Sequence, residues 1–180
     1  MAILSEDFNV METLHIRKAV EKDAEQIIQH SKKVLEENPD VMGTTLEEFN
    51  ITIEEEKDWI TSHSKHGLLL VAEVNGMIIG LLNFQLSPRK RFSHQGIFGM
   101  SIQEEFTSRG IGGALLKNLF EWAKKDSRVE KISLEVFSNN KRAIHLYTKM
   151  GFTEEGRRKK QIKLGPNKYV DDILMSKFIL

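Results

Sequence analysis

The feature that most constrains this chain is a glycine-rich turn that stands directly before an amphipathic segment. Behind the turn, apolar residues recur with helical spacing over positions 111–123. In front of it, the apolar stretch 96–102 has the length of a strand. The pattern therefore predicts that the turn joins the end of a strand to the first turn of a helix. The turn consists of Thr107, Ser108, Arg109, Gly110, Ile111, Gly112 and Gly113.

A turn of this kind can hold an anion. The first backbone N–H groups of a helix have no partner within the helix, and the helix dipole adds partial positive charge there. Glycine lacks a Cβ, so phosphate oxygens can approach the backbone closely, and Arg109 would add a charged donor. The turn alone leaves two interpretations open, a pyrophosphate cradle or a loop tightened only for packing. Its spacing matches neither a P-loop nor the dinucleotide-binding fingerprint G-x-G-x-x-G.

Composition narrows the classes of function. The 180 residues are 40% hydrophobic, and 26 basic residues balance 26 acidic ones. A zero net charge gives no general attraction to nucleic acid or to an anionic membrane. The chain has no cysteine, so it has neither a thiolate nucleophile nor a cysteine–metal site. We expect one domain over residues 12–180 after a leader over 1–11 and, because neither a signal-peptide pattern nor a membrane-spanning apolar run is present, a cytoplasmic protein.

Hydrophobic periodicity predicts an α/β fold with antiparallel hairpins. The clearest hairpin joins 68–74 to 77–86 through Asn75-Gly76, the preferred type I′ turn. Asp23 is expected to cap a helix, with Gln26 completing a capping box. Further strands are expected at 12–18, 96–102, 131–137, 152–164 and 169–179, and further helices at 54–64, at 111–125 and after 138–140 with Gly151 as C-cap.

Several charged groups outside the turn admit two interpretations. A cluster of acids within 47–58 could draw a cationic substrate, but a solvated helix face is favoured. The basic loop 88–91 is favoured as a solvated connection and the basic stretch 157–163 as an exposed edge strand, although each could bind an acidic group. His63 and His66 could share a helix face, but without a third ligand they predict no metal site. The acids are Glu47, Glu48, Glu54, Glu55, Glu56 and Asp58.

Two stretches, taken together, resemble a known family. The first is Gly110-x-Gly112-Gly113, and the second is Leu134-Glu135-Val136 followed by Asn140-x-x-Ala143-Ile144-x-Leu146-Tyr147-x-x-x-Gly151-Phe152. In this order they are similar to the GNAT family of acetyl-CoA-dependent N-acetyltransferases, over Leu14 to Leu180. One position departs from the family pattern, because Thr107 stands where Gln or Arg is usual. The segment 155–175 further resembles a bacterial branch of small-molecule or amino-acid acetyltransferases.

The resemblance implies both a fold and a cosubstrate site. The expected fold is a mixed, mostly antiparallel, twisted sheet of six to seven strands flanked by about four helices, with two strands splayed apart at the acetyl-CoA site. The pyrophosphate would lie on the amides of Arg109 to Gly113, and Asn140 would hydrogen-bond the pantetheine. No metal is expected. The residues expected to bind acetyl-CoA are Met100, Ser101, Ile102, Thr107, Ser108, Arg109, Gly110, Ile111, Gly112, Gly113, Asn140 and Tyr147.

The family's chemistry implies direct attack of a neutral amine on the thioester, since no cysteine could carry the acyl group. Glu135 is the candidate general base, directly or through water, against the alternative of an ordinary exposed strand glutamate; Glu104 is its rival. Tyr147 is the candidate acid for the departing thiolate, because a phenol with a pKa of ~10 donates at neutral pH. By spacing alone, Tyr147 would be a core aromatic.

The expected acceptor is a small primary amine, such as an amino acid, a polyamine or an antibiotic. Two alternatives stay open at this point: transfer to a protein N-terminus or lysine, and a non-catalytic sensor that binds acyl-CoA. The sequence specifies no oligomer, although a homodimer is the common homo-oligomer.

Overall fold

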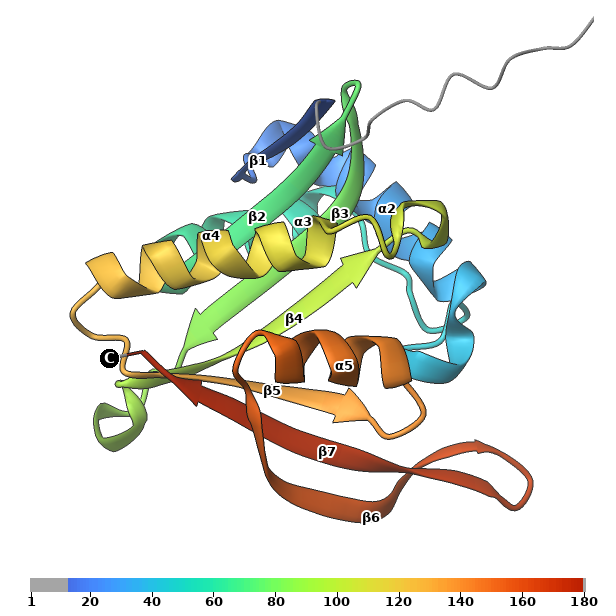
Figure 1. Ribbon diagram of the computed structural model, residues 1–180. Coiled ribbons are helices and arrows are strands. Elements are labelled where there is room, and N and C mark those ends of the chain that lie inside the picture. Colours follow the sequence, from blue (N-terminus) through green and yellow to red (C-terminus); the bar gives the residue numbers. More distant parts are fainter. Residues whose placement is uncertain (1–12, 180) are drawn as a thin grey trace, which may run out of the picture.

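The computed structural model describes residues 13–179, so the expected leader over 1–11 lies outside the described residues. A seven-stranded sheet runs in the order β1-β2-β3-β4-β5-β7-β6 (Figure 1), and all pairs are antiparallel except β4 with β5. The mixed α/β prediction is confirmed. The strands are β1 (Leu14–Lys18), β2 (Gly67–Val74), β3 (Met77–Leu86), β4 (Gln95–Ile102), β5 (Lys131–Phe137), β6 (Thr153–Gly165) and β7 (Lys168–Phe178). The helices are α2 (Ala24–Glu37), α3 (Ile53–His66), α4 (Ile111–Lys125) and α5 (Lys141–Lys149).

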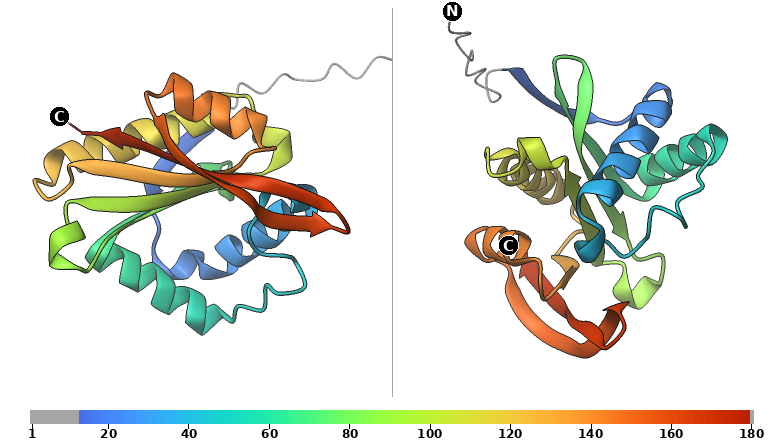
Figure 2. Two further views of the ribbon diagram at one scale, coloured as in Figure 1. Left: turned by 90° about the horizontal axis from the view of Figure 1, so that it is seen from below. Right: turned by 90° about the vertical axis from the view of Figure 1, so that its right-hand side faces the viewer.

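The helices lie on both faces of the sheet, α2 and α3 on one and α4 and α5 on the other (Figure 2). Val71 of β2 belongs to the core under α2 and α3, with Ile27 and Ile60. Its neighbour Leu70 points the other way, into the core that contains Leu115 of α4. Because both faces of β2 and β3 are covered, these strands read as near-continuous apolar runs rather than alternating ones.

Strands β4 and β5 pair over only part of their length. Their parallel ladder runs from Gln95 opposite Lys131 to Ile97 opposite Ser133 and then stops. Beyond that point the strands diverge (Figure 1), although β4 stays paired with β3 as far as Ile102. Residues 98–102 therefore present a backbone edge toward β5 that no described strand pairs with. This confirms the splay that the resemblance implied.

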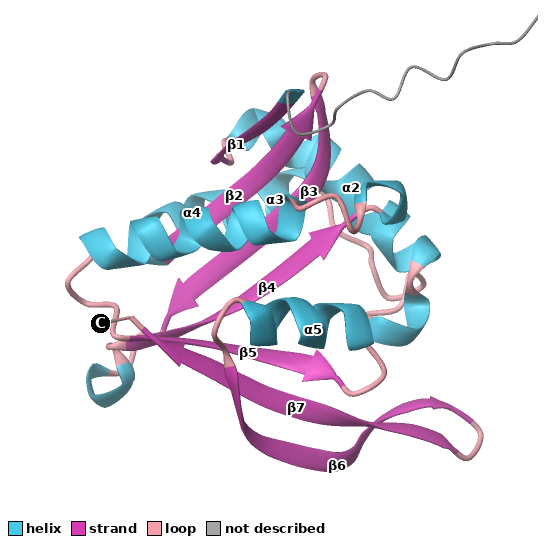
Figure 3. Cartoon of the chain, viewed as in Figure 1, coloured by secondary structure: helices cyan, strands magenta, loops and turns pink. Residues whose placement is uncertain are grey.

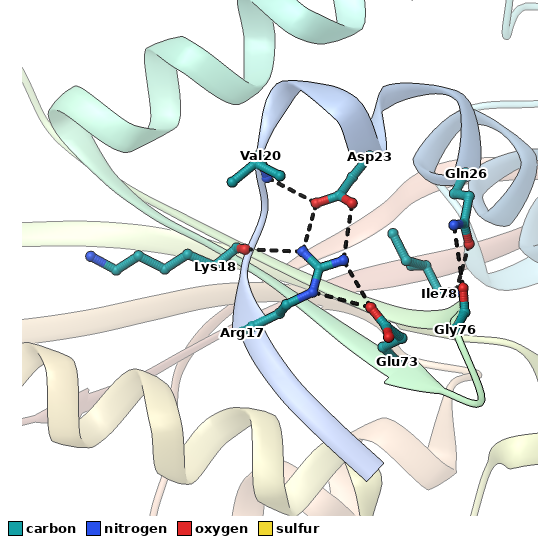
Figure 4. Close-up of polar contacts among 8 residues, drawn as sticks. All are labelled: Arg17, Lys18, Val20, Asp23, Gln26, Glu73, Gly76 and Ile78. Atoms are coloured by element: carbon teal, nitrogen blue, oxygen red, sulfur yellow. Dashed lines mark hydrogen bonds and ion pairs between the residues drawn. The ribbon is translucent and has the colours of Figure 1, made fainter. Parts of the chain in front are cut away.

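The expectation for Asp23 is wrong in detail. Asp23 precedes α2 but makes no side-chain cap; its carboxylate instead binds the Arg17 guanidinium at 2.7 and 3.0 Å and the Val20 amide at 2.9 Å (Figure 4). Arg17 also reaches Glu73 on β2, at 2.8 Å. The charged fork of Arg17 offers this carboxylate a stronger partner than helix amides do. Burial acts to raise the pKa of Asp23, but the bonds from Arg17 and Val20 outweigh it and lower the pKa.

Gln26 does not complete a capping box either. Its side chain accepts the Ile78 amide at 3.0 Å and donates to the Gly76 carbonyl at 3.3 Å, so it ties α2 to the β2–β3 hairpin (Figure 4). A capping box does occur at the start of α3, where Thr52 and Glu55 bond each other's backbone amides. That pair is a readable motif that the sequence analysis missed.

The remaining element predictions are confirmed within a few residues. Asn75 and Gly76 both have positive φ, as a type I′ turn requires, and Gly151 has φ +89° after α5. The basic stretch 157–163 lies on β6, the edge strand of the sheet, as expected. The loop 88–91 is an exposed connection after β3.

We expect Asp23→Asn to lower the free energy of unfolding by about 2 kcal/mol, because the substitution removes one of the two carboxylates that bind Arg17, at a side-chain position that is only 4% exposed. The loss is moderate because the Arg17 side chain is 35% exposed and solvent screens its charge. Urea unfolding at neutral pH measures the change. Asp58→Asn, on the exposed side of α3, is the matched control. An equal effect of the two substitutions would contradict a structural role for the Asp23–Arg17 pair.

Candidate functional site

The loop between β4 and α4 (Figure 3) ends in a row of unpaired backbone amides. Gly110 precedes α4 in the left-handed region, at φ +86°, and Ser108 has φ +58°. The first amide to bond back into this loop is that of Ala114, which donates to the Gly110 carbonyl at 3.0 Å. Among residues 13–179, the amides from Ser108 to Gly113 have no hydrogen-bond acceptor. They are the free donors at a helix N-terminus that the predicted anion site requires.

The glycines of this loop serve different physical needs. A Cβ on Gly112 would come within 2.7 Å of Leu146 on α5, so this glycine lets α4 and α5 pack closely. A Cβ on Gly113 would meet no protein atom within 4 Å, although Gly113 lies in the wall of a cavity. The packing interpretation therefore holds for Gly112, and the space that a ligand needs exists at Gly113.

A cavity of about 390 Å³, here called the loop cavity, extends from this loop along β4 to α5. Its charged side chains are Arg142 and Lys149 of α5, and no carboxylate lines it within the described chain. Thr107 accepts a hydrogen bond from Arg142 at 3.0 Å and so helps to hold this cation at the rim. The site residues in its wall are Met100, Ser101, Ile102, Thr107, Ser108, Gly110, Gly112, Gly113, Asn140 and Tyr147.

Two predicted site residues turn their side chains away from the loop cavity. Arg109 donates from Nε to the Glu105 carbonyl at 3.1 Å, and Ile111 is buried in the core beneath α4. Neither lines the cavity. What these residues offer a ligand is their backbone amides, because the Arg109 guanidinium is directed at its own loop.

A second cavity, of about 660 Å³, lies on the side of α2 and α3. Its charged residues are Glu55, Glu56 and Glu135, and no Lys, Arg or His in the described chain lines it. We call it the acidic cavity. It shares part of its wall with the loop cavity, including Met100, Ser101, Asn140 and Tyr147.

Tyr147 stands in this shared wall. Its ring packs edge-on against Phe98 at 5.6 Å between centroids, and the residue is 6% exposed. No described residue hydrogen-bonds its hydroxyl, and burial raises its pKa, which keeps the phenol protonated. The tyrosine therefore presents a neutral O–H donor where the two cavities meet. Beside it, Asn140 caps α5 by accepting the Ala143 amide at 3.2 Å.

The two candidate bases have different surroundings. Glu135 lines the acidic cavity and accepts a hydrogen bond from Arg158 at 3.0 Å, while the same arginine also binds Asp172. Glu104 lines neither cavity. Its carboxylate is held by both terminal nitrogens of Arg142, at 2.9 and 2.8 Å, and the bonds from Arg142 lower its pKa. A carboxylate with a lowered pKa is a weaker base, so the geometry favours Glu135.

A buried hydrogen-bond chain that the sequence analysis missed reaches Ser101 from α2. Gln103 donates from Nε2 to the Ile78 carbonyl at 3.2 Å and to His30 Nδ1 at 3.3 Å. Because Nδ1 of His30 accepts, its proton lies on Nε2, which donates to Ser101 Oγ at 2.9 Å. The Ser101 hydroxyl is then free to donate its own proton at the junction of the cavities. His30 and Ser101 are 71 residues apart, and no local pattern links them.

Of histidines 63 and 66, the first is held by contacts within its own helix. His63 is buried, with Nδ1 at 3.0 Å from the Trp59 carbonyl and its ring against Trp59. Over residues 13–179, no group of three potential ligands gathers to hold a metal ion. Within the same range, no helix is both long enough and apolar enough to cross a lipid bilayer.

Comparisons with known sequences agree with this geometry. Residues 33–152 match the acetyltransferase (GNAT) family. The L-amino acid N-acetyltransferase AaaT of Escherichia coli K12 is 36% identical over 108 residues, 60% of this chain and 66% of that protein. The N-alpha-acetyltransferase of Sulfurisphaera tokodaii is 29% identical over 149 residues, 77% of this chain and 80% of that protein. The match covers less than two thirds of AaaT and 43% of an N-acetyltransferase of Methanocaldococcus jannaschii.

Solved structures give the same result over more of the chain. An acetyltransferase of the GNAT family from Streptococcus pneumoniae superposes with a TM-score of 0.87 at 30% identity, over 92% of this chain and 99% of that one. YncA of Salmonella typhimurium, solved with its cofactor acetyl-CoA, superposes with a TM-score of 0.80 over 92% of this chain and 94% of its own. At 19% identity, this second likeness shows the fold alone.

The buried His30 makes stability depend on pH. Burial, with a smaller contribution from Lys33, lowers the pKa of His30 from 6.5 to about 4. Between these values the unfolded chain binds a proton that the folded chain does not, so stability falls as pH falls. We expect His30→Gln, which can keep both hydrogen bonds, to remove about 2 kcal/mol of the loss between pH 7 and pH 4.5. Urea unfolding at both pH values tests this.

The exposed His15→Gln is the control for the His30 substitution, because it changes the same side chain without burial. An unchanged pH dependence in His30→Gln would contradict a neutral buried imidazole at this position.

Proposed function

This chain belongs to the acetyltransferase (GNAT) family, and on that basis we propose that it transfers an acetyl group from acetyl-CoA to a primary amine of a small molecule. One observation carries the proposal. One cavity is lined by loop residues whose amides are unpaired, namely Ser108, Gly110, Gly112 and Gly113, by the unpaired edge of β4 and by Tyr147. The proposal includes a bacterial, cytoplasmic enzyme that acts without a metal, alone or as a homodimer.

The loop cavity fits the chemistry of the donor. The amides from Ser108 to Gly113 would bind the diphosphate, assisted by the helix dipole and by Arg142 and Lys149. The free edge of Met100–Ile102 would bond the amides of the pantetheine arm as a neighbouring strand would. The structure of YncA with acetyl-CoA supports this choice of cosubstrate for the fold.

Residues that line the acidic cavity would accept and donate the protons that move during acetyl transfer. Acetyl-CoA supplies an activated acyl group as a thioester. Glu135 would take the proton that an ammonium must lose, directly or through water, so that the nitrogen can form its bond to the carbonyl carbon. Tyr147 would give its proton to sulfur as the carbon–sulfur bond breaks. Transfer would be direct, because the chain has no cysteine thiol to carry the acyl group.

The oriented groups on β4 support catalysis over passive binding. A strand amide from Met100–Ile102 would polarise the thioester carbonyl, and the Ser101 hydroxyl, fixed as a donor by His30, lies in the same wall. A sensor that only binds acyl-CoA would need neither this donor nor a protonated Tyr147 beside an acceptor cavity. We therefore favour an enzyme over a sensor.

Gly113→Ala tests the diphosphate site with little risk to the fold. Gly113 lies in α4 with ordinary φ, so alanine should leave stability unchanged or raise it by up to ~1 kcal/mol. The new methyl group would enter the space over the amides, and we expect the Kd for acetyl-CoA to rise about 10-fold. Titration calorimetry measures Kd. Asn118→Ala, exposed on the same helix, should leave it unchanged.

Tyr147→Phe tests the proton donor. The ring and its contacts with Phe98 and Phe152 remain, so acetyl-CoA affinity and folding should hardly change. Loss of the hydroxyl should lower kcat by ~10²-fold, measured as thiol release in the presence of an amine. An unchanged kcat would remove the acid role from Tyr147 while leaving acetyl transfer itself in place.

A further inference from the structure

The acidic cavity contains one carboxylate without a partner. Glu55 accepts bonds from the Thr52 amide and hydroxyl, at 2.8 Å each, and Glu135 is paired with Arg158. Glu56 is different: its amide bonds the Thr52 carbonyl, but no described residue donates to its carboxylate or forms an ion pair with it.

Glu56 is also well buried. The residue is 6% exposed and belongs to the inward face of α3, with Ile60 and His63. In the described chain, His63 Nε2 is the one fully buried side-chain nitrogen or oxygen without a partner. The Glu56 oxygens therefore still touch solvent, and the solvent at this place is that of the acidic cavity, which Glu56 lines.

An unpaired carboxylate in such a place is unfavourable to the protein. Taking a carboxylate from water without a compensating cation costs free energy, and burial accordingly raises the pKa of Glu56. Every residue that lines the cavity is neutral or acidic, so no protein cation compensates it. A cationic group of a bound ligand would compensate the charge of the Glu56 carboxylate.

Glu56 and Tyr147 come from different elements, so a ligand cation at Glu56 would be a different group from the amine that reacts near Tyr147. Glu56 comes from α3, which packs over β2 and β3, whereas Tyr147 comes from α5 on the opposite face of the sheet (Figure 2). Tyr147 reaches the acidic cavity beyond the point where β4 and β5 part. The two groups thus enter one cavity from opposite faces of the sheet, and the rest of its lining is largely apolar and aromatic. This lining includes Met42, Phe49, Trp59, Leu81 and Phe98.

We propose that the acceptor is a small amine with a second cationic group and no carboxylate, held at its far end by Glu56. This inference rests on the proposed acetyl transfer. A free amino acid would bring its carboxylate into a cavity whose charged residues are Glu55, Glu56 and Glu135, with no cation to receive it. A dication of the diaminoalkane type matches both the charge of the cavity and its largely apolar lining.

A matched set of amines tests the proposal on the unmodified protein. Cadaverine and lysine differ by one carboxylate, and cadaverine and n-pentylamine differ by the second amine. We expect kcat/KM, measured as thiol release with acetyl-CoA, to be ~100-fold higher for cadaverine than for lysine and ~10-fold higher than for n-pentylamine. Mass spectrometry of the product identifies the acetylated amine.

Glu56→Gln then assigns the preference to one residue. The substitution keeps volume and removes charge, so KM for cadaverine should rise ~10-fold while kcat changes little. KM for n-pentylamine and the Kd for acetyl-CoA should stay unchanged. Glu54→Gln, exposed on the same helix and paired with Lys57, is the control and should change none of these values.

Three results would overturn the inference while acetyl transfer stands: equal use of lysine and cadaverine, preference for an amidated peptide such as Ala-Ala-Ala amide, or an equal change of KM for both amines in Glu56→Gln. If acetyl-CoA binds but no amine in the set is acetylated, the proposed function itself is refuted and the inference falls with it. The comparison of amines needs no variant, so it decides the matter even if Glu56→Gln does not fold.

Discussion

The early end of the ladder between β4 and β5 is the constraint on which the rest of this structure depends. Hydrogen bonding stops at Ile97 and Ser133, while both strands continue. A sheet paired to its end would bury the backbone of 98–102 and would separate the two faces completely. Because the strands part instead, β4 keeps free donors and acceptors, and α5 on one face can place Tyr147 in a cavity on the other.

The two cavities at this opening carry charges of opposite sign, which suits transfer from an anionic donor to a cationic acceptor. The loop cavity has the cations Arg142 and Lys149, and the acidic cavity has carboxylates. The wall that they share is neutral: it includes Met100, Ser101, Asn140 and Tyr147, with neutral His30 behind Ser101. An anionic donor would therefore be attracted to the loop cavity and the proposed cationic acceptor to the acidic cavity, with the hydroxyls of Ser101 and Tyr147 in the wall that the two cavities share.

The sequence predicted the parts of the fold that local chemistry decides. The Asn75-Gly76 hairpin, the alternation along 131–137 and the glycine turn before α4 each depend on neighbours within a few positions, and each is confirmed. The errors and omissions involve distant partners. The predicted helix cap at Asp23 is wrong because the strongest partner of this carboxylate, Arg17, lies on β1. The hydrogen bond between His30 and Ser101 joins residues 71 positions apart, so no local pattern predicts it.

Glu56 is an instructive intermediate case. The sequence predicts that the acids of α3 form a solvated face. Most of them are exposed, but Glu56 is buried. Its spacing of four residues from the buried Ile60 was a local signal that it shares the inward face of the helix. The acidic composition of the segment indicates a solvated face, whereas the helical spacing of Glu56 from Ile60 indicates that this one residue is buried.

The parts of the two cavities that are not shared also bear on the order of events. Only the loop cavity is lined by the loop before α4 and by Arg142 and Lys149 of α5, and only the acidic cavity is lined by α3 and by Glu135. Acetyl-CoA and the proposed amine could therefore be bound at the same time, and the chain has no cysteine thiol to carry an acyl group between two binding steps. The architecture therefore suits a ternary complex, with a sequential rate law rather than a ping-pong one.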